Sequence, residues 1–146
     1  MLVGTYKHGV DNKNRIFVPV KFRPALGHEC VLARDIMYDC LNLYSTTSWQ
    51  ELTEKIETLP MIKMRAIRQF LYPNADEVGL DSQGRIILNQ RLCADVGLAN
   101  AKEVMIIGAH THCQIWNVEQ WELFNANLTC EQSREAMLRD LKESDF

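Results

Sequence analysis

The stretch that decides the fold is Asp11–Arg15, with the sequence DNKNR, because it returns further along the chain as Asp81–Arg85, with the sequence DSQGR. Each copy keeps Asp in the first position and Arg in the fifth. Each is followed by an apolar run, Ile16–Val18 in one copy and Ile86–Leu88 in the other. Repetition of such a pattern in register indicates a tandem duplication.

The two copies stay in step beyond these turns. Because a repeated half-domain usually cannot bury its own apolar face, we predict that the two halves share one core around an approximate two-fold axis. We assign a first half to residues 1–52, linking helices to 53–75, a second half to 76–124 and a C-terminal helix to 125–146, with residues 1–124 forming one folded domain. The matched positions are Phe22 with Leu92, Leu26-Gly27 with Val96-Gly97, Leu43-Tyr44 with Ile115-Trp116, and Trp49 with Trp121.

The residues on both sides of each turn favour strands. We predict that residues 3–10 and 15–18 form a hairpin around the first turn, and that residues 77–80 and 85–88 form one around the second. The residue types at one matching turn position tolerate a positive φ, as tight turns require. These residues are Asn14 and Gly84.

Further strands and helices complete each half. Short helices are expected between Pro19 and Gly27 and between Asn89 and Gly97, because Pro and Asn favour helix starts and Gly favours helix ends. The pattern predicts a mainly β fold with helices, α+β overall. The other predicted elements are hairpins of residues 30–34 with 40–44 and 103–107 with 113–116, a helix with a capping box of Ser48 and Glu51, its counterpart from Val118, a linking helix over 64–72, and a last helix capped within 129–132.

The composition is that of a globular chain with room for one domain: 146 residues with a formal net charge of −3. No apolar run reaches the roughly 18 residues that a membrane span needs, and the N-terminus lacks the pattern of a secretion signal. We therefore expect a cytoplasmic protein without a membrane partner. The five cysteines are scattered and form no C-x-x-C pair, so we expect reduced and mostly buried thiols.

The charge is segregated along the chain. The negative total disfavours a non-specific nucleic-acid coat, which needs many Lys and Arg contacts to phosphate. Residues 1–23 nevertheless hold an excess of basic residues, and residues 117–146 an excess of acidic ones. A duplicated basic turn on a two-fold axis favours a partner that is itself repetitive, and duplex nucleic acid fits that description.

Several motifs occur in a fixed order: residues 11–16, Pro19 with Phe22-Arg23, residues 40–44 with Trp49, residues 81–86, residues 103–108, and Ile115-Trp116. This ordered set resembles the MraZ family over nearly the whole chain, up to about Trp121. The chain departs from the family pattern in having Asn14 for Gly, Asn89 for Pro and Cys93 for Arg. The second turn is therefore less basic than the pattern implies.

The resemblance implies a fold, an assembly and a function. It implies two tandem AbrB-like swapped-hairpin half-domains related by pseudo-two-fold symmetry, in subunits that assemble into a ring-shaped homo-oligomer. It further implies a bacterial transcriptional regulator at the nucleoid. Such a regulator binds double-stranded DNA at repeats upstream of the division and cell-wall gene cluster, and it generally represses its own operon.

The chemistry of the turns predicts which residues meet DNA. The Asp at the start of each turn can accept backbone N–H bonds and lock the loop, so we assign that role to Asp11 and Asp81. A planar guanidinium can bond a phosphate or the guanine edge bidentately, which makes Arg15 and Arg85 the predicted central contacts. The flanking contacts predicted on the loop tips are Lys13, Asn14, Gln83 and Gly84, and those predicted on phosphates are Lys7, Lys21 and Arg23.

Other interpretations remain open from the sequence. The Asp–Arg pairs can be structural salt bridges that fix the turns, with or without DNA contact. The chain can be an oligomeric scaffold whose acidic C-terminal region binds proteins, or an antitoxin-like member of the same superfamily. We expect no enzyme, cofactor or metal site: no phosphate loop, nucleophile elbow or paired-carboxylate spacing occurs, and His110, His112 and Cys113 have no partner cluster nearby.

Overall fold

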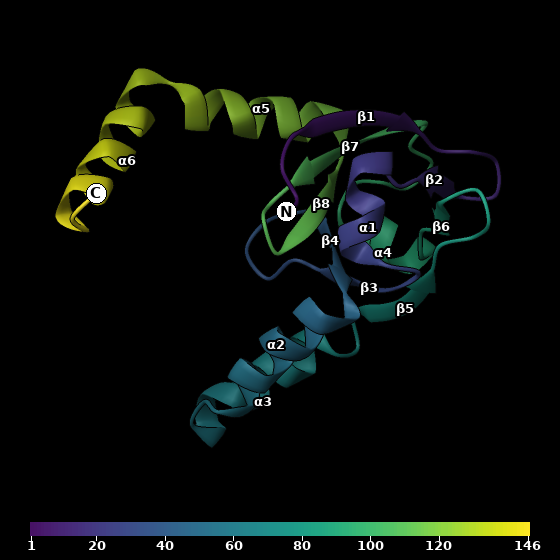
Figure 1. Cartoon of the computed structure of the whole chain (residues 1–146), viewed down its shortest axis with the longest axis horizontal. Helices are drawn as coiled ribbons and strands as arrows, with labels where there is room; N and C mark the ends of the chain where they lie inside the picture. Colours follow the sequence, from purple (N-terminus) through teal and green to yellow (C-terminus); the bar gives the residue numbers. More distant parts are fainter.

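A computed structural model describes all residues, 1–146 (Figure 1). It holds a six-stranded antiparallel sheet in the order β1-β7-β8-β4-β3-β5 and a separate two-stranded ribbon of β2 with β6. The predicted α+β class, with mostly β structure in the body and helices around it, is confirmed. The strands are β1 (Thr5–Gly9), β2 (Arg15–Phe17), β3 (Glu29–Arg34), β4 (Leu41–Ser45), β5 (Ala75–Gly79), β6 (Arg85–Ile87), β7 (Glu103–Gly108) and β8 (His112–Trp116).

The longer helices form two arms that leave the sheet in different directions (Figure 1). One arm is the pair α2–α3, and the other is the pair α5–α6 that ends the chain. None of the helices is long and apolar enough to cross a membrane. The helices are η1 (Val20–Phe22), α1 (Arg23–Leu26), α2 (Thr46–Glu57), α3 (Met61–Leu71), α4 (Gln90–Asp95), α5 (Val118–Thr129) and α6 (Glu131–Glu143).

Strand pairing at the two turns differs from the predicted local hairpins. β1 does not pair with β2; it pairs with β7 of the other half, while β2 pairs with β6. Likewise β5 pairs with β3 and not with β6. Alternation of side chains identifies a strand but not the strand that pairs with it. In this fold, each turn leads the chain from the large sheet into the ribbon. The other two predicted hairpins, β3–β4 and β7–β8, are confirmed.

The pairing obeys the predicted two-fold symmetry. Exchanging β1 with β5, β3 with β7 and β4 with β8 leaves the order of the large sheet unchanged. The ribbon register also maps onto itself, because Arg15 faces Ile87, Phe17 faces Arg85, and Ile16 faces its own counterpart Ile86. The approximate axis therefore passes through the middle of the ribbon, between the two turns.

Both halves contribute to one main core, as the duplication predicts. Ile16 and Ile86 are each 1% exposed, and they pack with side chains from the large sheet and the short helices. Phe22 and Leu92, at matched positions, belong to the same cluster. Burial of these apolar groups is the main stabilising term of the fold, and neither half contains it alone.

Some helix boundaries differ from the predicted ones. α2 begins at Thr46, because the Ser45 hydroxyl accepts the Ser48 N–H at 3.1 Å, so the capping box predicted at Ser48 is wrong. α3 begins at Met61, earlier than predicted, because Pro60 precedes it as N-cap. α6 follows Cys130, whose side chain makes no capping bond. The cap predicted at Asn89 is confirmed, since its side chain accepts the Leu92 N–H at 3.1 Å.

Candidate nucleic-acid interface

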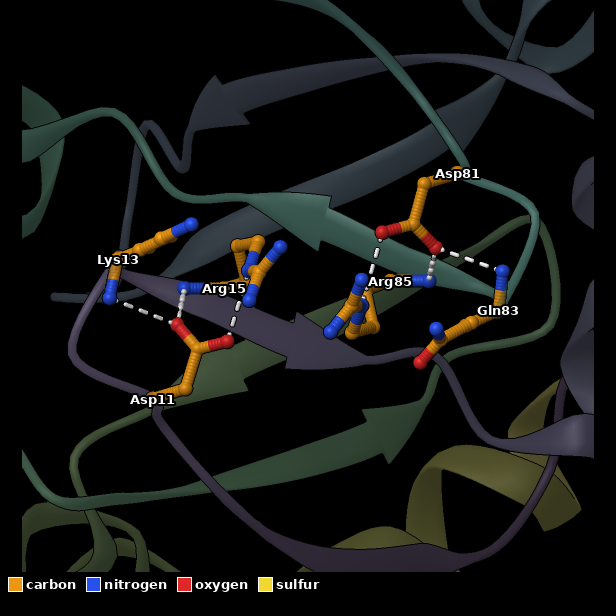
Figure 2. Close-up of polar contacts among 6 residues, drawn as sticks. All are labelled: Asp11, Lys13, Arg15, Asp81, Gln83 and Arg85. Carbon is orange, nitrogen blue, oxygen red and sulfur yellow. Dashed lines mark hydrogen bonds and ion pairs between the residues drawn. The ribbon is translucent and has the colours of Figure 1, made fainter.

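The first turn is locked by one carboxylate. Asp11 Oδ1 accepts the backbone N–H of Lys13 and that of Arg15, each at 2.9 Å, while its Oδ2 accepts Arg15 Nε at 2.7 Å (Figure 2). Desolvation would raise the pKa of Asp11, but the hydrogen bonds and the charge of Arg15 outweigh it and lower the pKa. The predicted lock and the predicted salt bridge are therefore both present in one arrangement.

The second turn repeats this arrangement. Asp81 Oδ1 accepts the N–H of Gln83 at 2.9 Å and that of Arg85 at 3.0 Å, and Oδ2 accepts Arg85 Nε at 2.8 Å (Figure 2). The backbone hydrogen bond from Arg85 is the main reason why the pKa of Asp81 is lowered, although desolvation opposes it. Two turns far apart in the sequence thus present the same geometry.

The ribbon brings the two arginines onto one outward face. Side chains alternate along β2 and β6, so the buried Ile16 and Ile86 leave their neighbours pointing away from the core. Figure 2 shows the arginines projecting from this face between the two aspartates. The Nε of each arginine donates a hydrogen bond to the aspartate of the same turn. The two Nη groups of each arginine make no hydrogen bond within the chain.

Two apolar side chains complete this face and were missed by our sequence reading. Phe17 is 44% exposed and Ile87 is 61% exposed, and each stands across the ribbon from an arginine. Arg85 Cζ lies 5.8 Å from the centroid of the Phe17 ring, within the range of a cation–π contact. The alternation of the strand after each turn was the available signal, because it places the third residue on the same side as the first.

The remaining predicted residues divide into three groups. Lys13 and Gln83 are exposed on the turns, and Asn14 and Gly84 adopt the positive φ values of 59° and 80° that the turns require. Lys7 on β1 and Lys21 on η1 are exposed outside the turns. Arg23 lies beside the second turn although it belongs to the first half, since its Nε donates to the Val18 carbonyl at 2.9 Å and its guanidinium lies over Gly84.

His112 and Cys113, which the sequence places close together, lie in packed surroundings. The ring of His112 packs at a tilt against that of Tyr44, with ring centroids 4.9 Å apart, and burial lowers the pKa of His112. Cys113 is buried in the main core, where burial raises its pKa to about 12. No group of three or more His, Cys, Asp or Glu side chains is placed to hold a metal ion. All five cysteines are free thiols, and four of them are buried.

Comparison with known proteins agrees with this repeated architecture. The model of the family described as "MraZ protein, putative antitoxin-like" matches residues 1–69 and again residues 71–143, one match for each half. The chain belongs to the MraZ family. The resemblance read from the ordered motifs is thereby confirmed, and the two matches agree with the tandem duplication.

Curated relatives in the MraZ family cover almost the whole chain. A protein of Clostridium tetani named "Transcriptional regulator MraZ" is 39% identical over 140 residues, which are 94% of this chain and 96% of that protein. A protein of the same name from Caldicellulosiruptor saccharolyticus is 40% identical over 141 residues, with the same coverage. A third, from Clostridium acetobutylicum, is 38% identical over 127 residues. The chain is therefore a member of a family of bacterial transcriptional regulators, a family named for regulation and not for an enzymatic activity.

Proposed function

We propose that this protein is a transcriptional regulator without catalytic activity that binds double-stranded DNA through the β2–β6 ribbon. The observation that carries the proposal is the pair of arginines on one outward face of the ribbon. Their side chains are 23% and 19% exposed, each is held by Nε, and their Nη groups make no hydrogen bond within the chain. We further propose that it acts at the nucleoid, on repeats upstream of the division and cell-wall gene cluster. There it would repress its own operon.

A two-stranded ribbon with guanidinium groups on its outer face suits the major groove. A two-stranded ribbon fits this groove, and a guanidinium there can donate two hydrogen bonds to O6 and N7 of guanine. Because the aspartates hold Arg15 and Arg85 in place through Nε, less side-chain entropy is lost when the Nη groups bind. The approximate two-fold axis of the ribbon suits a DNA site with matching symmetry.

The remaining affinity comes from phosphate contacts and from assembly. Lys7, Lys13 and Lys21 are exposed and can contact the backbone of DNA without reading its sequence. A chain with a net charge of −3 has a modest attraction for DNA by itself. A ring-shaped homo-oligomer would present several ribbons to several DNA repeats at once, and avidity would then offset the modest charge of each subunit.

A gel shift on the DNA upstream of the gene, titrated with salt, tests the proposal. The wild-type protein should shift this DNA, and its affinity should fall steeply with added salt. Arg15→Ala and Arg85→Ala should each weaken binding by about 1–3 kcal/mol, because each removes a predicted base contact. Arg139→Ala is the matched control, since it removes an exposed arginine from α6, and it should bind as the wild type does.

The outcome of that experiment separates the competing functions. A protein-binding scaffold would give no shift at any ionic strength, which would contradict the proposal. An antitoxin would also bind DNA, and the family description includes the word antitoxin-like. A toxin gene beside this one would favour the antitoxin function, which is compatible with the proposed interface.

A further inference from the structure

The two ends of the ribbon are related by symmetry but are built from different residues. At one end, the Val18 carbonyl accepts a hydrogen bond from Arg23 Nε at 2.9 Å. At the other end, the matching carbonyl of Leu88 accepts its bond from the side-chain amide of Asn14. The same backbone oxygen is therefore satisfied in both places, but the donor comes from a different position in the sequence.

A steric reason explains this exchange. A Cβ atom built on Gly84 would lie 2.2 Å from Arg23 Cζ and 2.5 Å from Arg23 Nε, so the guanidinium can lie there only because Gly84 has no side chain. At the first turn the matching residue is Asn14, which carries a Cβ and supplies the donor itself. The position that matches Arg23 is Cys93, a short side chain that is 2% exposed. Gly84 with Arg23 and Asn14 with Cys93 are thus two complementary pairs.

This difference also places a positive side chain of the first half, Arg23, beside the turn of the second half. The first turn carries a cation on its own loop, Lys13, at the position where the second turn has the neutral Gln83. Arg23, from the first half, lies against the second turn and lines a surface pocket together with Asp81 and Gly84. Its Nη groups make no hydrogen bond within the chain. Each turn therefore has a cation nearby besides its central arginine: Lys13 and Lys102 at the first turn, and Arg23 at the second.

We propose that Arg23, which the sequence predicts to contact phosphate, makes this contact as part of the second turn and so supplies the cation that the loop of that turn lacks. The Val18 carbonyl and the bare Cα of Gly84 hold its guanidinium at the end of the ribbon, where the Nη groups can meet the DNA backbone beside Arg85. The second turn then has a nearby cation although its own loop carries the neutral Gln83 where the first has Lys13. This inference rests on the proposed function, whereas the complementarity of the two pairs does not.

A thermodynamic cycle at positions 23 and 84 tests the complementarity without DNA. Gly84→Asn alone should lower the Tm by roughly 5 °C, because the new side chain displaces the guanidinium of Arg23. Arg23→Cys alone leaves the Val18 carbonyl without its donor and should also lower the Tm. The double variant Gly84→Asn/Arg23→Cys copies the pair found at the first turn, so its Tm should be higher than the sum of the two single losses predicts. Strictly additive losses would overturn the complementarity.

The same double variant tests the role in DNA binding, because it should remain folded. Its plot of log affinity against log salt should be shallower than that of the wild type by about 0.9, the value for one lost phosphate contact on duplex DNA. Arg139→Ala should leave the slope unchanged. If the double variant keeps the slope of the wild type while binding by the wild type still depends on Arg15, the role of Arg23 is refuted and the proposed function is not. Absence of binding by the wild type would instead refute the proposed function, and the Tm cycle would still report on the complementarity.

Discussion

At the scale of single residues, the aspartate of each turn decides how its arginine is presented. Asp11 and Asp81 each accept two backbone N–H bonds and one Nε bond, so one side chain shapes the loop and aims the guanidinium. Such partly exposed ion pairs contribute little to stability by themselves. In the proposed interface, they hold the Nη groups of Arg15 and Arg85 in position for DNA.

The aspartates predict a loss of stability in acid. Their pKa is lowered in the folded protein, so the stability they contribute is present above their ordinary value of 3.8 and is lost as the pH falls through the lowered pKa. The Tm of the wild type should exceed that of Asp11→Asn/Asp81→Asn at neutral pH, and the difference should narrow below about pH 4. Thermal melts from neutral pH into acid measure this, and a difference independent of pH would contradict it.

At the scale of elements, the two faces of the ribbon carry different kinds of residues. The inner face carries Ile16 and Ile86, which meet each other at the two-fold axis and join the main core. The outer face carries the arginines with Phe17 and Ile87. Because neighbouring residues of a strand point to opposite sides, one residue packs in the core while the next lies on the face proposed to bind DNA.

Two adjacent isoleucines of β6 test this division. Ile86→Ala should lower the free energy of unfolding by about 2–5 kcal/mol, because it opens a cavity in the core. Ile87→Ala, the matched control on the outer face, should lower it by no more than about 1 kcal/mol. Urea unfolding of both variants measures the difference. Equal losses of unfolding free energy would mean that the outer face is also packed against other residues. The outer face would then not be free to bind DNA.

At the scale of the whole molecule, the exchanged strands make the two halves one folding unit. β1 and β5 find their partners in the opposite half, β4 pairs with β8, and the core draws on both halves. The helical arms extend beyond this body (Figure 1). Neither half can satisfy its backbone hydrogen bonds or bury its apolar face without the other.

Unfolding of the body should therefore be a single cooperative transition. Urea curves followed by tryptophan fluorescence and by far-UV circular dichroism should coincide, because no half remains folded after the other is lost. Leu32→Ala, a core substitution in the first half, should shift both curves together by the same amount. Separate transitions for the two probes would contradict a shared core.

The sequence by itself determined the duplication and the two turns locked by Asp–Arg pairs, because these depend on the spacing of residues that are close in the chain. Asp11 and Arg15 are close in the chain, so their contact follows from the turn, and Asn14 and Gly84 carry the turn conformation in their own chemistry. Helix caps could be predicted only in part. Ser45 and Ser48 are equally suited to cap α2, and Ser45 is the cap because β4 ends there.

Only the tertiary structure decided which residues pair between strands and which cation lies beside which turn. The pattern of β1 and β2 is equally suited to a local hairpin, but pairing with β7 and β6 satisfies their hydrogen bonds while burying both apolar faces in one core. Arg23 lies against Gly84, which is distant in the chain, and it fits there because no Cβ occupies the space. Contacts between distant residues depend on that exchange of strands, and no local pattern in the chain encodes it.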